Sequence, residues 1–233
     1  MNELPYASAL IVGAGPGISA SVARALRQRG LKVALAARDP RKLAGLATEI
    51  GASTFAADAG RPEAVAELFD AVEARQGVPG IVLYNASGRA QGSLAELEPA
   101  KVEAALRVSA FGGFLVVQQA ARRMLPLGKG AILLTGATAS LKGYAGSAAF
   151  AMGKFALRGL AQSAARELGP KGIHVAHFII DGGVRSAARP DPADAPDSTL
   201  DPDAIARVYL DTLAQSRSAW AHEIDLRPWV ERF

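Results

Sequence analysis

The chain has 233 residues, half of them hydrophobic, which is enough to bury one large core. This length favours a single domain that spans residues 1–233. Its net charge of +4 is spread without a basic block, and it has no cysteine and only three scattered histidines, which argues against nucleic-acid binding, disulfides and a metal site. Without a charged leader or an apolar run of about 18 residues, we expect a cytoplasmic protein with no membrane partner.

Short apolar runs alternate with longer helical patterns along the whole chain. This alternation is typical of repeated βαβ units and a parallel sheet. The predicted strands are 8–12, 32–36, 53–56, 80–84, 130–135, 174–180 and a weaker 219–223. The predicted helices are 17–29, 40–50, 62–76, 98–125 and 147–168. The sequence therefore predicts an α/β fold with a doubly wound, seven-stranded parallel sheet and helices on both faces.

The first predicted strand ends in closely spaced glycines, Gly13, Gly15 and Gly17, and Ile18 then begins a helical pattern. A tight turn of this kind lets backbone N–H groups approach a phosphate, and the dipole of the following helix favours the negative charge. The pattern indicates a nucleotide pyrophosphate site. The glycines alone would equally serve close packing between strand and helix, so their context has to decide.

Several motifs in order supply that context. Gly13-x-x-x-Gly17-Ile18 follows the first strand, Asp58 the third and Asn85-Ala86 the fourth, and Lys154 lies on the long 147–168 helix. With these motifs the sequence resembles the short-chain dehydrogenase/reductase family over nearly its whole length. The resemblance implies a Rossmann fold, a nicotinamide cofactor, a small-molecule substrate, and a homodimer or homotetramer.

The resemblance also implies which residues contact the cofactor. Asp58 matches an acidic residue that accepts from the adenine amino group, although a loop aspartate also forms turns. Asn85 and Ala86 match the segment lining the adenosine side, with Tyr84 in place of its first Asn. Val184 would offer its backbone to the nicotinamide carboxamide, and Ser186 would replace a Thr near the pyrophosphate.

Cofactor type depends on the residues after the second strand. Arg38 stands there with Asp39 beside it, and no earlier acid is available to bind a bare ribose. The forked donors of an arginine suit the 2′-phosphate of NADP. The sequence favours NADP(H) over NAD(H). In the alternative, Arg38 is a solvated loop charge and Asp39 recognises the ribose.

The catalytic positions depart from the family. The resemblance implies a Tyr four residues before Lys154, a Ser thirteen residues before that Tyr, and an Asn. Phe150, Ala137 and Ser109 occupy those three positions, and Lys154 alone is retained. Phe150 and Lys154 still lie one helical turn apart on the same face.

Two neighbours could restore some proton chemistry. Tyr144 lies six residues before Phe150, in a loop expected to face the nicotinamide end of the cleft, and Thr138 follows Ala137 directly. We predict these two residues together with Lys154 as catalytic candidates. The alternative for Tyr144 is a surface or interface aromatic.

Two functions remain open at this point. One is an NAD(P)(H)-dependent oxidoreductase of carbonyl or alcohol substrates with a non-standard active site. The other is a non-catalytic NADP(H)-binding or regulatory protein. Residues 186–203, rich in Pro and Asp, take the place of the family's substrate loop. Six small residues of the 147–168 helix would allow close helix pairing in an oligomer or simply pack on the sheet: Ala148, Ala149, Ala156, Gly159, Ala161 and Ala164.

Overall fold

The computed structural model describes residues 4–231. Within these residues, seven strands form one parallel sheet in the order β3-β2-β1-β4-β5-β6-β7. The strands are β1 (Ser8–Val12), β2 (Lys32–Ala37), β3 (Ser53–Ala56), β4 (Ile81–Tyr84), β5 (Gly130–Thr135), β6 (Ile173–Ile180) and β7 (Glu223–Leu226). The predicted doubly wound, seven-stranded α/β fold is confirmed.

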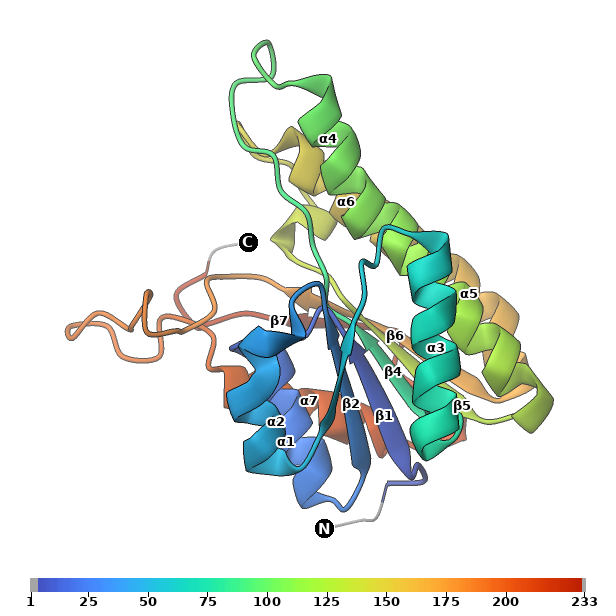
Figure 1. Ribbon diagram of the computed structural model, residues 1–233. Coiled ribbons are helices and arrows are strands. Elements are labelled where there is room, and N and C mark those ends of the chain that lie inside the picture. The colour runs from blue at the N-terminus through green and yellow to red at the C-terminus, as the bar shows by residue number, and fades with distance from the viewer. Residues whose placement is uncertain (1–3, 232–233) are drawn as a thin grey trace.

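Helices cover both faces of the sheet (Figure 1). One face carries α1 (Ile18–Gln28), α2 (Ala44–Ile50) and α7 (Pro202–Leu213), and the other carries α3 (Pro62–Gln76), α5 (Gly112–Met124) and α6 (Ala148–Leu168). Successive strand side chains point to opposite faces, so Leu10 packs toward α3, α5 and α6 while Ile11 packs toward α1 and α7. Burial on both faces explains why the strands are continuous apolar runs rather than alternating ones.

The strand order reverses between β1 and β4, which lie side by side although β2 follows β1 in the chain. Loops leaving the carboxyl ends of these two strands diverge to opposite faces, and in open α/β sheets ligands bind in the crevice this creates. The turn at Gly13 and the segment at Asn85 both start at this point. The fold thereby brings two of the predicted cofactor motifs together.

The prediction of one regular helix over residues 98–125 is wrong. This part of the chain consists of α4 (Pro99–Leu106), a π-helical segment (Arg107–Phe111), α5 and a 3₁₀ turn (Leu125–Leu127), and α4 extends beyond the sheet edge (Figure 1). Helical periodicity does not distinguish α from π geometry over a single turn, and tertiary contacts at Ser109 and Tyr84 select the wider turn here. The predicted helix 40–50 likewise begins with a 3₁₀ turn at Pro40–Leu43 before α2.

The carboxyl-terminal part differs most from the prediction. Residues 202–213, of which the first two were assigned to a loop, form α7, with Asp201 accepting from the Asp203 N–H as N-cap and Pro202 in the first turn. That cap and the apolar spacing from Ile205 to Leu213 were readable signals of a helix start. The last strand is 223–226 rather than 219–223, because Glu223 pairs in register with His177 of β6.

Among residues 4–231, none of the helices combines the length and the apolarity that crossing a membrane requires.

Candidate active site

Backbone conformation and close packing require glycine in the turn after β1. Gly13 has φ +80°, and a Cβ there would lie 2.3 Å from the backbone nitrogen of Ala86. Gly17 has φ +90°, and no atom lies within 4 Å of the Cβ position of Gly15 or Gly17. The turn therefore packs against the β4 segment at one glycine and opens to free space at the other two.

Ser19 and Asn85 tie the turn to the β4 segment. The buried Ser19 hydroxyl donates to the Gly13 carbonyl at 3.3 Å and accepts from the Asn85 side-chain amide at 2.8 Å. The Asn85 backbone N–H donates to the carbonyl of Val12. The Ser19 hydroxyl thus stabilises the strand side of the turn and leaves its open side clear.

The turn fits a dinucleotide. Helix α1 begins after Gly17 with no side-chain cap and no acidic residue in its first turn. Its first N–H groups and the positive end of its dipole therefore face the open space above Gly15 and Gly17 with no protein acceptor from a cap. A pyrophosphate supplies the charge and the acceptors that this turn lacks.

Asp58 follows β3 and accepts a hydrogen bond from the Gly60 N–H at 2.9 Å. This is the turn-forming role that the sequence left open as the alternative. Only one carboxylate oxygen makes that bond, so the assignment of Asp58 to the adenine stays a prediction.

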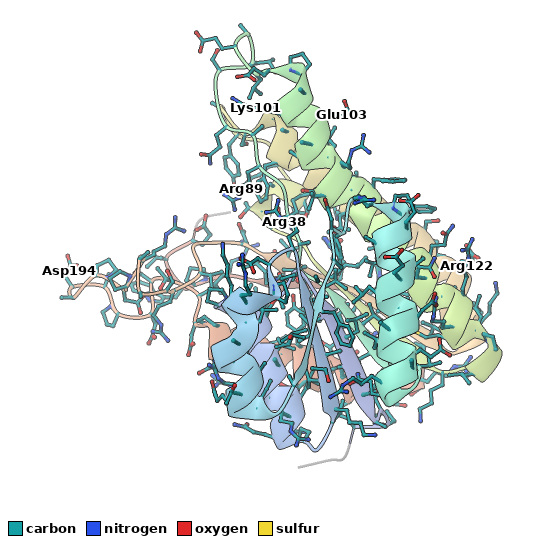
Figure 2. The ribbon with its side chains drawn as sticks, in the orientation of Figure 1. Arg38, Arg89, Lys101, Glu103, Arg122 and Asp194 are labelled. Atoms are coloured by element: carbon teal, nitrogen blue, oxygen red, sulfur yellow. The ribbon has the colours of Figure 1, made fainter. Side chains whose placement is uncertain are left out.

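Arg38 and Asp39 behave differently after β2. Asp39 caps the following 3₁₀ turn through the Arg41 N–H and pairs with the Arg41 guanidinium at 2.8 Å. Hydrogen bonding from Arg41 lowers the pKa of the Asp39 carboxyl. Arg38 is exposed above the carboxyl edge of the sheet and makes no ion pair with any residue in the described chain (Figure 2). Of the two, Arg38 is the side chain available to a ligand.

The catalytic corner lies where β5 ends and α6 begins. Lys154 is buried, and its ammonium donates to the Thr135 carbonyl at 2.7 Å. Burial, with a smaller contribution from the charge of Arg89, lowers the pKa of Lys154 to about 8. The Phe150 ring is half-buried with its centroid 5.7 Å from the lysine nitrogen. The structure therefore brings Phe150 and Lys154 together as the spacing predicts.

Ser109 and Tyr84 act as braces around this corner. The Ser109 hydroxyl accepts from the Gly88 N–H at 2.9 Å and donates back to the Gly88 carbonyl. The Tyr84 hydroxyl donates to the Val108 carbonyl, within the π-helical segment, and burial raises the pKa of this phenol. Ser109 is thus engaged with backbone and fixes the segment that carries Gly88 and Arg89.

The two hydroxyl candidates, Thr138 and Tyr144, differ in exposure. Thr138 is half-buried in a 3₁₀ turn (Thr138–Ser140), directly after Ala137. Tyr144 is half-exposed in the loop before α6, where its backbone is fixed by hydrogen bonds to Ser147. Their catalytic roles stay predictions.

His177 on β6 was not singled out by its sequence. It is fully buried, neither ring nitrogen has a hydrogen-bond partner in the described chain, and its Nδ1 lies 3.5 Å from a Glu223 oxygen. A Cβ on Gly136 would come within 2.4 Å of the ring, so that glycine makes room for it. Burial outweighs the attraction of Glu223 and lowers the pKa of His177 to about 4. A lone histidine in an apolar strand carries no local signal of this environment.

The segment after β6 places the remaining cofactor candidates. Val184 forms a bridge with Leu200 in which the bonds run through Gly183 and Arg185, so the N–H and C=O of Val184 itself take no part. Ser186 is exposed and closes a tight turn with Arg189 through two backbone bonds. The backbone of Val184 is therefore available to a ligand, whereas that of Ser186 is committed to a turn.

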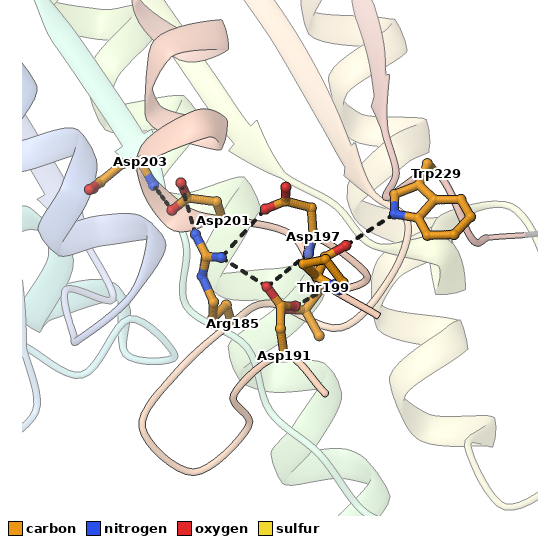
Figure 3. A network of polar contacts seen from close by, with 8 residues as sticks. Arg185, Asp191, Asp197, Thr199, Asp201, Asp203 and Trp229 are labelled. Atoms are coloured by element: carbon orange, nitrogen blue, oxygen red, sulfur yellow. Dashed lines mark hydrogen bonds and ion pairs between the residues drawn. The ribbon is translucent and has the colours of Figure 1, made fainter. Parts of the chain in front are cut away.

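Ion pairs of Arg185 stabilise the loop that follows this segment. Arg185 pairs with Asp191 at 2.9 Å, Asp201 at 3.0 Å and Asp197 at 3.7 Å (Figure 3). Hydrogen bonds from Thr199, with further ones from Arg185 and Asp197, lower the pKa of Asp191 to about 2. Asp191, Asp197 and Asp201 therefore stabilise the fold of this loop.

Comparison with known proteins supplies the family. The family model described as short chain dehydrogenase matches residues 7–192, which is most of the chain. The chain belongs to the short chain dehydrogenase family. The predicted resemblance is confirmed, and membership covers both the glycine turn and the catalytic corner.

Individual members of the short chain dehydrogenase family agree with this assignment. The chain is 33% identical over 172 residues to (21S)-21-acetoxyl-apo-melianone synthase SDR of Melia azedarach, which covers 72% of this chain and 63% of the relative's length. A short-chain dehydrogenase structure from Rhodopseudomonas palustris is 35% identical with TM-score 0.82, covering 96% of this chain and 99% of the other. A metagenomic short-chain oxidoreductase in complex with NADP is 28% identical with TM-score 0.84, covering 97% and 98%.

Proposed function

We propose that this protein is an NAD(P)(H)-dependent oxidoreductase that interconverts a carbonyl and an alcohol at a non-standard active site, with NADP(H) as the preferred cofactor. The observation that carries the proposal is the pairing of an open dinucleotide turn at Gly13–Gly17, after β1, with the buried Lys154 at the end of β5, on the same edge of the sheet. Membership of the short chain dehydrogenase family supports it over a purely nucleotide-binding role.

Different residues of the chain would position the cofactor and supply charge at the reacting atoms. When bound, the nicotinamide supplies hydride to the carbonyl carbon. The Gly13–Gly17 turn and the Val184 backbone would position the cofactor, while Asn85 holds the turn in place. Lys154 presents a fixed positive charge at the end of β5. Much of the rate of such a reaction comes from this positioning, which Phe150 and Ala137 leave intact.

The proton needs a different donor, because Phe150 has none to give. The proton for the alcohol oxygen would come from water, or from the hydroxyl of Tyr144 or Thr138. Loss of a positioned general acid typically costs about 10²–10⁴ in rate, so we expect slow turnover rather than none.

The cofactor preference is supported by Arg38. Its guanidinium is exposed and unpaired in the described chain, whereas Asp39 is engaged by Arg41. The NADP complex of the metagenomic relative agrees with this choice.

A calorimetric titration with NADPH and NADH, followed by a panel of carbonyl substrates, tests the proposal. We expect tighter binding of NADPH and measurable, slow oxidation of NADPH by the wild-type protein. Binding of NADPH without oxidation on any carbonyl, in the wild type and in Phe150→Tyr/Ala137→Ser alike, would instead establish the non-catalytic function.

We propose a homodimer or homotetramer in the cytoplasm. Of the small residues on α6, Ala149, Ala161 and Ala164 are buried within the chain itself, whereas Ala156 and Gly159 are exposed. Phe114 and Phe155 are also largely exposed, which supports a helix-mediated contact between subunits.

A further inference from the structure

Two cations flank one aromatic ring at the catalytic corner. The guanidinium carbon of Arg89 lies 4.2 Å from the centroid of the Phe150 ring, and the Lys154 nitrogen lies 5.7 Å from the same centroid. Arg89 comes from the segment after β4, and the two other residues come from α6. Figure 2 shows Arg89 above the carboxyl edge of the sheet, the edge at which Lys154 contacts the end of β5.

Neither cation has a carboxylate partner among residues 4–231. The hydrogen bond of Lys154 goes to a backbone carbonyl, and Arg89 has no hydrogen bond or ion pair with any described residue. Other arginines of the chain do pair, as Arg158 does with both oxygens of Glu223. The corner therefore holds two positive charges, and none of the described carboxylates pairs with either of them.

Lys154 is buried and Arg89 is exposed, and the charge of Arg89 acts on the buried lysine. Burial and the repulsion from Arg89 together lower the pKa of Lys154. Arg89 is nevertheless kept near Lys154 by the Phe150 ring, and the Ser109 hydroxyl fixes the adjacent Gly88 backbone from both sides. An anion placed at Arg89 would relieve the repulsion.

The shape of the donor indicates which anion. A guanidinium presents a planar fork of N–H donors that matches the two oxygens of a carboxylate. The Arg89 guanidinium carbon lies over the Phe150 ring, and because Arg89 is exposed its N–H donors are accessible to a ligand. Phe150 also occupies the position next to Lys154 where the reaction takes place under the proposed function, so the anion belongs to the reacting molecule.

We propose that Arg89 is a specificity-determining residue that binds a carboxylate of the substrate, so that the enzyme acts on oxo acids or the corresponding hydroxy acids rather than on uncharged ketones or alcohols. The proposal rests on the proposed oxidoreductase function, because it assigns the substrate class of that same site.

A matched pair of substrates tests it. 2-Oxobutanoate and butan-2-one differ by a carboxylate in place of a methyl group, and kcat/KM for NADPH oxidation is measured for both with the full chain. We expect the wild type to prefer the oxo acid by about 10–100-fold, the effect of one bidentate charged contact. Arg89→Gln should remove most of that preference through KM, and Arg89→Lys should restore part of it.

The control is Arg122→Gln, which removes the same charge from the exposed surface of α5 (Figure 2) and should keep the preference of the wild type. General damage to the fold would slow both substrates together and leave their ratio unchanged. Reduction of both substrates at equal efficiency, or an Arg89→Gln variant with unchanged preference, would overturn the proposal while the oxidoreductase function stands.

A binding measurement separates the two proposals. Calorimetric titration of oxamate into the NADPH complex requires no turnover. We expect Arg89→Gln to lower the affinity for oxamate at least 10-fold and to leave the affinity for NADPH unchanged. Such binding without any NADPH oxidation would support the carboxylate site and refute the oxidoreductase function. A loss of NADPH affinity in Arg89→Gln with no effect on oxamate would assign Arg89 to a cofactor phosphate and overturn the proposal.

Discussion

The cofactor edge and the catalytic corner of this protein lie at the same side of the sheet but tolerate sequence change very differently. At the edge, the groups that we predict to face the cofactor belong to the backbone of Gly15, Gly17 and Val184. At the corner, the family's chemistry resides in side-chain hydroxyls, and Phe150 and Ala137 have lost them. A site built from backbone survives substitution as long as the fold does, whereas a site built from functional groups changes with single residues.

The two regions also differ in their charges. Arg38 at the edge is exposed to water, which screens it. Lys154 at the corner is buried, which lowers its pKa, and the charge of the nearby, exposed Arg89 adds to that shift. A buried charge at the corner therefore depends on its neighbours, whereas the exposed charge at the edge depends mainly on the solvent.

The largest effect is expected from Gly13→Ala at the edge. The new Cβ would stand 2.3 Å from the Ala86 nitrogen at φ +80°, so the turn must move, at a cost of about 2–6 kcal/mol. We expect cofactor binding to be undetectable by calorimetry and the melting temperature to fall. Gly45→Ala in α2, where a Cβ meets nothing, is the control and should bind normally. Normal binding by Gly13→Ala would refute the close packing of turn and β4 segment.

At the corner, Phe150→Tyr/Ala137→Ser restores the two missing hydroxyls beside Lys154. A positioned general acid is worth about 10²–10⁴ in rate, and we expect a gain in kcat toward that range with little change in NADPH affinity. Phe155→Tyr adds the same phenol to an exposed position of α6 and should gain nothing. An unchanged kcat in the double variant would show that the corner no longer orients its substrate for the family's chemistry.

Beneath the corner, His177 should make the fold sensitive to acid. Its pKa of about 4 lies below the ordinary 6.5, so the unfolded chain binds more protons between these values and stability falls as pH drops from 6.5 to 4. This corresponds to about 2–3 kcal/mol, measurable by urea unfolding at several pH values. His177→Leu should lose most of that slope while Glu223 and Arg158 remain, and the buried His174, whose pKa burial also lowers, accounts for a remaining part. The half-buried His222→Gln should keep the slope, and equal slopes in both variants would contradict the assignment to His177.

The smallest effect is expected for Arg38→Gln. Loss of one charged contact to the 2′-phosphate should lower the affinity for NADPH by about 10–100-fold and leave the affinity for NADH unchanged. Lys32→Gln, at the opposite end of the same strand, removes an equal charge and should alter neither affinity. If NADPH and NADH weaken equally in Arg38→Gln, the residue contributes no recognition of the phosphate.

Local pattern by itself determined the sheet, the glycine turn and the spacing of Phe150 and Lys154, because strand and helix periods and turn residues act over a few positions. Only the tertiary structure decided which charges meet: it leaves Arg38 without a partner among residues 4–231, places Arg89 on the Phe150 ring, and buries His177 against Glu223. It also decided the π-helical turn at Ser109 and the register of β7. These features depend on pairs of residues far apart in the chain, and their burial and distance arise only when the sheet and its covering helices have packed.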